Sequence, residues 1–201
     1  MDEVFWNQRY ASQEFAYGIE ANSYLTSTLT SLPAGRILLP GDGEGRNAVF
    51  AARLNWDVLA VDLSEEGRNK AMRLASQYKV SLKYVVDRLE NFEPEKGAFD
   101  VVGLIFVHLP PEFRGMVHQR CVDALRPGGL LVLEAFTPAQ RNFASGGPKD
   151  AELLYSADIV RQDFSRLELV SLEEKTVILK EGPYHDGEAA VVRMLAKKPS
   201  A

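Results

Sequence analysis

The sequence predicts an α/β fold in which helices cover both faces of a mostly parallel sheet. Three observations lead to this expectation. Short apolar runs alternate with helix-compatible segments between residues 36 and 136, a glycine-rich turn follows the first run, and further apolar runs with little helical material between them occupy the tail. Alternating strands and helices favour a parallel sheet, and an antiparallel addition at the edge of such a sheet is common.

The alternating region carries local signals for each element. Strands are expected at residues 36–40, 58–62, 82–86, 100–106 and 130–136, and helices at 45–55, 64–78 and 111–125. Ser64 suits a helix start because its hydroxyl caps free backbone amides. Pro111 fits the first turn of the third helix, and residues 126–129 (Arg-Pro-Gly-Gly) stop that helix and turn into the fifth strand.

The two flanks of this region have different patterns. Residues 20–32 include a helix that Pro33-Ala34-Gly35 ends. Residues 137–150 form a long loop without secondary structure, and loops of this kind often serve as lids or binding elements. A short helix at 157–164 and strands at 167–172, 176–180 and 189–196 complete the chain.

Composition limits the class of protein. The chain has 201 residues, which predicts one domain spanning residues 1–201. A net charge of -5 gives no basic field for nucleic acid, and no 18-residue apolar stretch predicts a membrane span. The start lacks the basic region of a secretory signal, so a cytoplasmic protein is expected. One cysteine and three histidines argue against internal disulfides and against a protein-built transition-metal site.

The most informative segment is the glycine-rich turn. Gly41, Gly43 and Gly45 follow the apolar run that ends the first strand. Glycine permits positive φ and lets a ligand approach the backbone, because it has no Cβ. The second strand ends in Asp62, about 20 residues beyond the first glycine, where β-α-β units hold a ribose by its hydroxyls. Together these features predict a nucleoside-containing cofactor at the carboxyl edge of the sheet.

The glycine spacing separates two cofactor classes. A dinucleotide fingerprint requires G-x-G-x-x-G, and here Arg46 occupies the position of the last glycine because the third glycine comes one residue early. A G-x-G-x-G turn followed by an acidic strand end is instead typical of a class I S-adenosylmethionine-dependent methyltransferase. A nicotinamide-dependent oxidoreductase of related topology is the alternative.

The resemblance extends along nearly the whole chain. Five segments fall in the order expected for the small bacterial class I methyltransferases related to tellurite-resistance methyltransferase and, more distantly, thiopurine methyltransferase. They are Trp6-Asn7-Gln8-Arg9-Tyr10, Gly41-Asp42-Gly43-Glu44-Gly45-Arg46-Asn47-Ala48, Asp62-Leu63-Ser64, Leu125-Arg126-Pro127-Gly128-Gly129 and Met194-Leu195-Ala196-Lys197-Lys198. The resemblance implies a Rossmann-like, doubly wound sheet of seven strands with an antiparallel C-terminal edge strand.

The resemblance also implies a division of the domain and a cofactor, S-adenosyl-L-methionine. Residues 1–35 would form a helical cap, 36–136 the cofactor-binding core, and 137–201 the substrate loop and antiparallel strands. Asp62 would hold the ribose, Leu63 the adenine ring, Asp87 the adenine amino group and Phe106 the methionine side. The further contacts expected with the cofactor come from the cap, the glycine turn, the following helix start and the third strand end: Arg9, Tyr10, Gly41, Asp42, Gly43, Gly45, Arg46, Asn47 and Arg88.

One position departs from the family pattern. Many members carry an acidic residue two positions before the first glycine, where this chain has Leu39. The ammonium group of the cofactor would then be held by backbone carbonyls or by a carboxylate from Asp42 or Glu44, since hydrogen bonds to ionised groups are the stronger ones.

Three side chains are candidates for the acceptor site. His108 follows the fourth strand, at the sheet edge where α/β proteins bind ligands. His185 and Glu181 lie in a turn-rich late segment that reaches toward the acceptor in the resembling enzymes. A thiol or a chalcogen oxyanion such as tellurite needs no strong base, whereas an oxygen or carbon acid would require one of the histidines.

The sequence leaves the methyl acceptor unidentified beyond a small molecule. A monomer or a homodimer is expected. A non-catalytic protein that binds the cofactor and regulates a partner is the remaining alternative, because Leu39 departs from the pattern.

Overall fold

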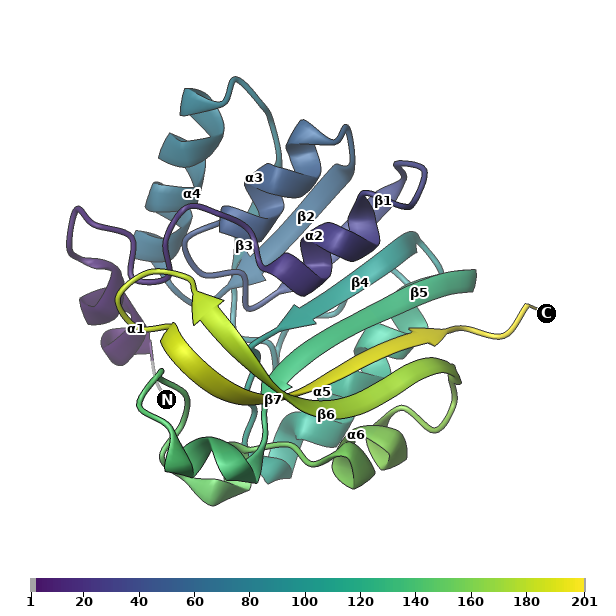
Figure 1. The fold of residues 1–201 in the computed structure, drawn as a ribbon. Helices are drawn as coiled ribbons and strands as arrows, with labels where there is room; N and C mark the ends of the chain where they lie inside the picture. The colour runs from purple at the N-terminus through teal and green to yellow at the C-terminus, as the bar shows by residue number, and fades with distance from the viewer. Residues whose placement is uncertain (1–2, 201) are drawn as a thin grey trace.

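In the computed structural model, which describes residues 3–200, one mixed sheet forms the centre of the molecule (Figure 1). Its strands lie in the order β3-β2-β1-β4-β5-β7-β6. Their bounds, in that order, are Lys83–Val86, Asp57–Asp62, Arg36–Pro40, Phe99–Ile105, Leu125–Phe136, Asp186–Lys197 and Glu168–Lys180. The pairs from β3 to β5 are parallel, and β7 runs antiparallel to both of its neighbours. The predicted seven-stranded, mostly parallel sheet is confirmed.

The helices lie on both faces of this sheet. Residues on alternate sides of β1 show the division, because Ile37 and Leu39 pack with helices α2 and α3 whereas Leu38 packs with α5. Helix α4 packs beside α3, and α6 lies next to α5. The bounds of the helices are α1 Glu3–Tyr10, α2 Ser23–Leu29, α3 Arg46–Arg53, α4 Glu65–Gln77, α5 Pro111–Ala124 and α6 Ala157–Asp163.

The antiparallel end of the sheet differs in detail from the expectation. The last strand, β7, lies one place in from the edge, and β6 is the outermost strand. The separate strands expected at 167–172 and 176–180 are one continuous strand, β6. The charged run Glu173-Glu174-Lys175 lies between the two expected strands, but an edge strand that is exposed on both faces accommodates charge, and charged edges oppose unwanted pairing.

Two connections also differ from the sequence prediction. Strand β5 begins at Leu125, five residues earlier than expected, because Leu125 pairs with Phe99 before the register shifts. The loop after β5 is not free of secondary structure, since it contains two 3₁₀ helices, η1 (Pro138–Asn142) and η2 (Ala151–Leu153). The predicted helix cap at Ser64 is confirmed, because its hydroxyl accepts a hydrogen bond from the Gly67 amide at the start of α4.

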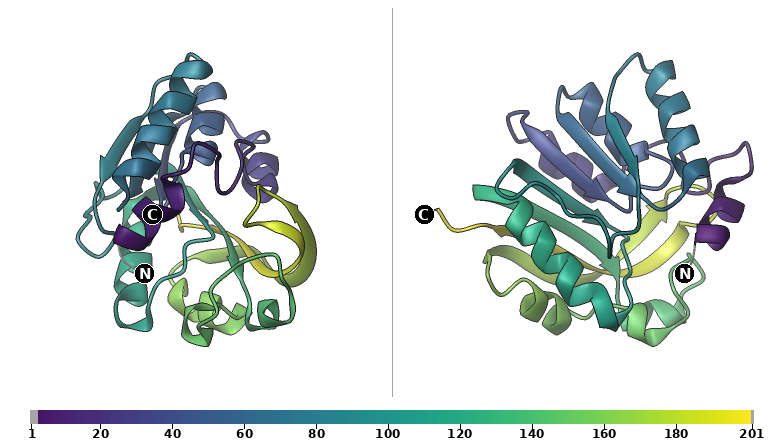
Figure 2. Two further views of the ribbon diagram at one scale, coloured as in Figure 1. Left: turned by 90° about the vertical axis from the view of Figure 1, so that its left-hand side faces the viewer. Right: turned by 180° about the vertical axis from the view of Figure 1, so that it is seen from behind.

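The carboxyl ends of the parallel strands meet on one side of the molecule. Helix α1 and the loop between β6 and β7 lie on this same side, as both views of the ribbon show (Figures 1 and 2). Strand β1 has β2 on one side and β4 on the other, so the winding direction reverses at its end. Ligands of open α/β sheets bind at such a switch point. None of the helices in residues 3–200 is long and apolar enough to cross a membrane.

Candidate active site

A cavity of about 330 Å³ opens at the switch point. This volume lies within the range of small-molecule sites. The walls come from α1, the loops after β1, β2, β3, β4 and β5, and the β6–β7 loop. The sequence-predicted residues among the lining are Arg9, Tyr10, Gly41, Asp42, Gly43, Arg46, Asn47, Asp62, Leu63, Arg88, Phe106, His108 and His185.

The glycine turn needs glycine at all three positions. Gly41, Gly43 and Gly45 have φ values of 66°, 57° and 85°, in the left-handed region that favours glycine. A Cβ on Gly43 would lie 2.6 Å from the Tyr10 hydroxyl, and one on Gly45 would lie 2.3 Å from the Ala71 Cβ on α4. The first two glycines therefore shape the cavity wall, while the third lets α3 and α4 pack closely.

Asp62 lies at the end of β2 with its carboxylate tied to the backbone. Its Oδ2 accepts a hydrogen bond from the Gly43 amide and its Oδ1 from the Ser64 amide, both at 3.0 Å. Each carboxylate oxygen can accept a further bond, so the group can still receive hydroxyls from the cavity. Burial raises the pKa of Asp62 to about 6, although the backbone donors lower it.

The cap closes the cavity from the other side. Tyr10 is buried and stacks on Trp6, with ring centroids 5.4 Å apart. The Arg9 guanidinium lies over the Tyr184 ring at 3.9 Å from its centroid and contacts the Tyr17 hydroxyl at 3.4 Å. The cap thus brings an aromatic wall and one cation to the cavity.

Of the two site residues predicted after the third strand, only one lies in the cavity wall. Arg88 and the following Leu89 line the cavity, whereas Asp87 is not part of its wall. The Asp87 carboxylate accepts a hydrogen bond from the Arg88 amide at 2.8 Å. Its own amide donates to the Asp62 carbonyl, which keeps the chain next to the cavity.

Of the two candidate replacements for the missing acid at position 39, Glu44 is engaged elsewhere and Asp42 is engaged in part. Glu44 pairs with Lys70 at 2.6 Å, and both side chains are almost completely buried. Asp42 Oδ2 accepts from the Ala48 amide at the start of α3, and its Oδ1 is buried without a hydrogen-bond partner among the residues described. Burial raises the pKa of Asp42 to about 7.

The start of α3 connects the glycine turn to the late loop. Arg46 is buried and its guanidinium lies 2.7 Å from the Glu181 carboxylate. The Asn47 side chain accepts from the Asn22 amide at 3.0 Å. Glu181 therefore lies behind the cavity wall as the partner of Arg46, and it does not line the cavity.

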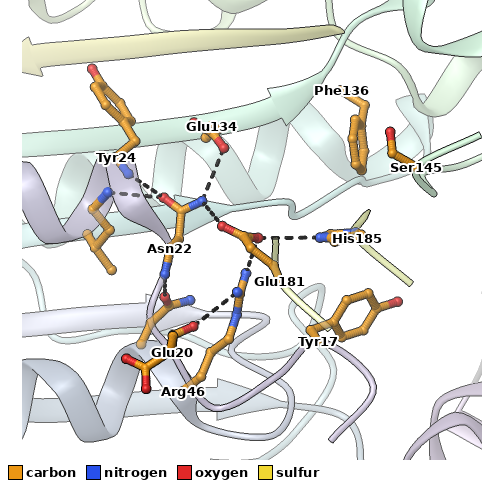
Figure 3. A network of polar contacts seen from close by, with 12 residues as sticks. Tyr17, Glu20, Asn22, Tyr24, Arg46, Glu134, Phe136, Ser145, Glu181 and His185 are labelled. Atoms are coloured by element: carbon orange, nitrogen blue, oxygen red, sulfur yellow. Dashed lines mark hydrogen bonds and ion pairs between the residues drawn. The ribbon is translucent and has the colours of Figure 1, made fainter. Parts of the chain in front are cut away.

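Glu181 is the centre of a buried polar network that the sequence did not reveal (Figure 3). The Asn22 side-chain amide donates to Glu181 at 3.0 Å and to Glu134 at 3.1 Å. Arg193 pairs with Glu134, so two arginines balance two buried carboxylates. Hydrogen bonds and the Arg46 and His185 charges lower the pKa of Glu181 to about 2, against the opposing effect of its burial.

His185 stands between this network and the cavity. Its Nδ1 faces Glu181 Oε2 at 3.5 Å, longer than an ordinary hydrogen bond. The ring is surrounded by Tyr17, Phe106 and Phe136, with centroids 4.5, 4.6 and 5.2 Å away. Burial lowers the pKa of His185, although Glu181 opposes that shift. A neutral imidazole therefore lines the cavity at neutral pH.

His108 is held by the backbone on both sides of its ring. Its Nδ1 lies 2.6 Å from the Leu153 carbonyl, and its Nε2 accepts from the Phe136 amide at 3.3 Å. The ring is therefore neutral, with the proton on Nδ1, and burial lowers its pKa to about 4. In this arrangement neither nitrogen is available to take a proton from a ligand.

Phe106 adds backbone strain at the same place. It has a φ of 54°, which is uncommon for a residue with a Cβ. Its amide donates to the Glu134 carbonyl at 2.7 Å, and its ring packs against Phe136 at 4.6 Å. Strained residues of this kind cluster at functional sites.

Comparison with known proteins finds similarity to methyltransferases. Residues 37–129 match a family model described as a methyltransferase domain. The chain is 28% identical over 162 residues to thiocyanate methyltransferase 1 of Brassica oleracea, a match that covers 77% of this chain and 65% of that protein. The chain therefore spans less than two thirds of the length of this curated relative.

Solved structures share the fold. NodS, an N-methyltransferase of Bradyrhizobium japonicum solved with S-adenosyl-L-homocysteine, superposes with a TM-score of 0.75 at 13% identity, over 98% of both chains. TehB from Haemophilus influenzae superposes with a TM-score of 0.73 at 14% identity, over 98% of this chain and 66% of that one. These superpositions show the fold of the chain, and residues 37–129 within it match the methyltransferase-domain family.

Proposed function

We propose that the protein transfers a methyl group from S-adenosyl-L-methionine to a small sulfur nucleophile. The observation that carries the proposal is the division of one cavity into two ends. The glycine turn and Asp62 form one end, and an aromatic enclosure around His185 forms the other. A nucleoside cofactor fits the first end, and a small acceptor fits the second.

The residues present fit the cofactor. Asp62 offers acceptor positions for ribose hydroxyls because its two backbone donors occupy only part of its capacity. Leu63 provides an apolar contact beside it for the adenine. Glu44 is neutralised by Lys70, so the ammonium group would be held by backbone carbonyls or by the buried Asp42 carboxylate.

When bound, the cofactor supplies a methyl group that its positive sulfur already activates, so the difficult chemistry belongs to the cofactor. The protein orients the acceptor and excludes water. Orientation of two reactants can contribute effective molarities of about 10⁵ to 10⁸ M. Tyr10 and Trp6 cover the cavity from the cap, and Phe106 and Phe136 wall its acceptor end.

The acceptor end suits sulfur. Aromatic walls favour a soft, polarisable atom, and the relative from Brassica oleracea is named for methylating thiocyanate, a sulfur compound. A thiol that arrives protonated would give its proton to His185 Nε2, because Nδ1 is the ring nitrogen that faces Glu181. Tellurite stays a candidate acceptor, because its tellurium atom is also soft. His108 is assigned to the cavity wall, since both of its ring nitrogens are engaged by the backbone.

Calorimetric titration with S-adenosyl-L-homocysteine tests the cofactor site. The wild type should bind it, and Asp62→Asn should bind it about 10- to 100-fold more weakly, the loss expected for hydrogen bonds to a charged group. Asp57→Asn is the matched control, because Asp57 lies exposed at the opposite end of the same strand. Equal affinities for wild type and Asp62→Asn would refute the assignment.

Turnover separates an enzyme from a regulator. Product formation from methyl-labelled cofactor with thiocyanate, hydrosulfide, small thiols and tellurite should be measured by mass spectrometry. Methylated sulfur product supports the proposal. Cofactor binding without any methylated product would favour the non-catalytic alternative.

A further inference from the structure

We propose that Arg9 is the residue that selects the charge of the acceptor: it makes the acceptor end of the cavity a subsite for a small sulfur anion. This inference rests on the proposed methyl transfer and adds a specificity-determining residue to it. Three features support the assignment: the missing counter-ion of Arg9, its ring contacts and its position next to His185.

Arg9 differs from the other buried cations around the cavity. Arg46 pairs with Glu181 at 2.7 Å, and Lys70 pairs with Glu44 at 2.6 Å. Within residues 3–200, Arg9 forms no ion pair with a carboxylate, although it is half-buried in the cavity wall. A partly desolvated cation without a counter-ion is unfavourable, so an anionic ligand gains from meeting it.

The contacts of Arg9 orient the guanidinium for this purpose. Its Cζ lies 3.9 Å from the Tyr184 ring centroid and 5.1 Å from that of Phe5, and one nitrogen contacts the Tyr17 hydroxyl at 3.4 Å. Stacking uses the flat faces of the group. The remaining N–H bonds in its plane are then available to an anion, and charge-assisted bonds of this kind are the strong ones.

Arg9 belongs to the acceptor end rather than to the nucleoside end. Its guanidinium lies over the ring of Tyr184, the residue that precedes His185, and both of these residues line the cavity. Tyr17 contacts both, through its hydroxyl to Arg9 and through its ring to His185. The nucleoside contacts of Asp62 and Leu63 come instead from the loop after β2.

The loop after β5 packs tightly beside His185. Gly146 and Gly147 line the cavity, and a Cβ on Gly146 would lie 2.1 Å from the Tyr184 carbonyl and 3.0 Å from His185 Cδ2. A Cβ on Gly147 would lie 2.8 Å from the Phe136 ring. The two glycines therefore allow the loop after β5 to pack closely against His185 and Phe136.

An anionic acceptor simplifies the reaction. A sulfur lone pair forms the new bond to the methyl carbon while the bond between that carbon and the cofactor's sulfonium breaks, and the released electron pair neutralises the sulfonium. An anion brings no proton, so His185 is not required as a base for it. Arg9 would pair with the negative charge of the acceptor until methylation of the sulfur neutralises that charge.

The test uses Arg9→Met, which keeps an unbranched apolar stem and removes the charged guanidinium, with Arg9→Lys as the conservative variant. Thiocyanate is titrated calorimetrically into the complex with S-adenosyl-L-homocysteine, at an ionic strength fixed with chloride. Arg9→Met should weaken thiocyanate binding and raise its KM about 10- to 100-fold, while Arg9→Lys should retain part of the affinity. Arg73→Met is the matched control, since Arg73 is an exposed helical arginine.

The outcomes separate this inference from the proposed function. Unchanged thiocyanate affinity in Arg9→Met overturns the assignment of Arg9. An equal loss of S-adenosyl-L-homocysteine affinity also overturns it, because Arg9 would then hold the carboxylate of the cofactor. A wild type that methylates neutral thiols and not thiocyanate overturns the anion subsite alone, whereas a wild type that binds no cofactor overturns the proposed function itself.

Discussion

The Lys70 ammonium lies 2.6 Å from the Glu44 carboxylate, and both side chains are almost completely removed from solvent. Lys70 also donates to the carbonyls of Ser12 and Glu14, and Glu44 accepts from the amides of Ala16 and Tyr17. This pair therefore joins the glycine turn, helix α4 and the cap segment at one point.

Removing one member of this pair should destabilise the protein. Lys70→Met leaves the Glu44 charge buried and uncompensated, which typically costs about 3 to 5 kcal/mol. Urea unfolding at neutral pH measures the loss. Lys96→Met, at an exposed position, is the control and should change stability little. Similar values for the two variants would show that the pair contributes nothing specific.

Gly45 should tolerate alanine far less well than Gly97 does. Both have a positive φ, 85° and 66°, so both substitutions carry about 1 to 2 kcal/mol of backbone strain. Only at Gly45 would the new Cβ collide with α4, whereas nothing lies within 4 Å at Gly97. Overpacking should add about 1 to 3 kcal/mol to Gly45→Ala. Thermal unfolding of both variants compares them, and equal losses would contradict the close packing of α3 on α4.

His108 should make stability fall on the acid side of neutrality. Its pKa is lowered from 6.5 to about 4. Between pH 6.5 and pH 4, His108 is therefore protonated in the unfolded chain and neutral in the folded chain. Stability is complete above pH 6.5 and is lost as the pH falls toward 4, by about 3 kcal/mol. Protonation of His108 would also place two hydrogen-bond donors, Nε2–H and the Phe136 amide, face to face, so the bond between them would be lost.

His108→Gln isolates this effect, because glutamine offers a donor and an acceptor and does not titrate. Between pH 6.5 and 4.5 the variant should lose about 2 kcal/mol less stability than the wild type. The comparison also cancels the opposite contributions of Asp42 and Asp62, whose raised pKa values favour the folded state at lower pH. Parallel pH profiles for the two proteins would contradict the role given to His108.

Glu181 should matter more for protonated thiols than for thiocyanate. Glu181 raises the pKa of His185, so Glu181→Gln should make the imidazole a weaker base and lower kcat for thiols about tenfold. The acid limb of the thiol profile should move to lower pH. Glu173→Gln, on the exposed edge strand, is the control. An equal loss for thiocyanate and thiols would leave Glu181 a purely structural partner of Arg46.

The sequence predicted the parts of the site that are local along the chain. The glycine turn and Asp62 lie within one β-α-β unit, and their spacing reflects the geometry of that unit. The strand cores were found for a similar reason, because their apolar runs are short and continuous. The sequence prediction divided the edge strand β6 in two, because the residues at its centre are charged rather than apolar.

The polar network around Asn22 was not predictable in this way. Asn22 meets Glu134 and Glu181 across 112 and 159 residues, and asparagine and glutamate are usually exposed. Lys70 did carry a usable signal, because it lies on the same helical stripe as the buried residues Gly67, Ala71 and Leu74. The positive φ of Phe106 has no such signal, since phenylalanine rarely adopts it.

The position of β7 between β5 and β6 has a consequence for synthesis on the ribosome. Strand β6 is made before β7 and, among the described strands, pairs only with it. Once residues 168–180 have left the ribosome and before β7 has done so, the chain would therefore present thirteen residues of unpaired strand, with Val170 and Ile178 already turned outward. Unpaired strand edges invite aggregation, so chaperone binding should peak in this interval of translation and fall once residue 197 has emerged.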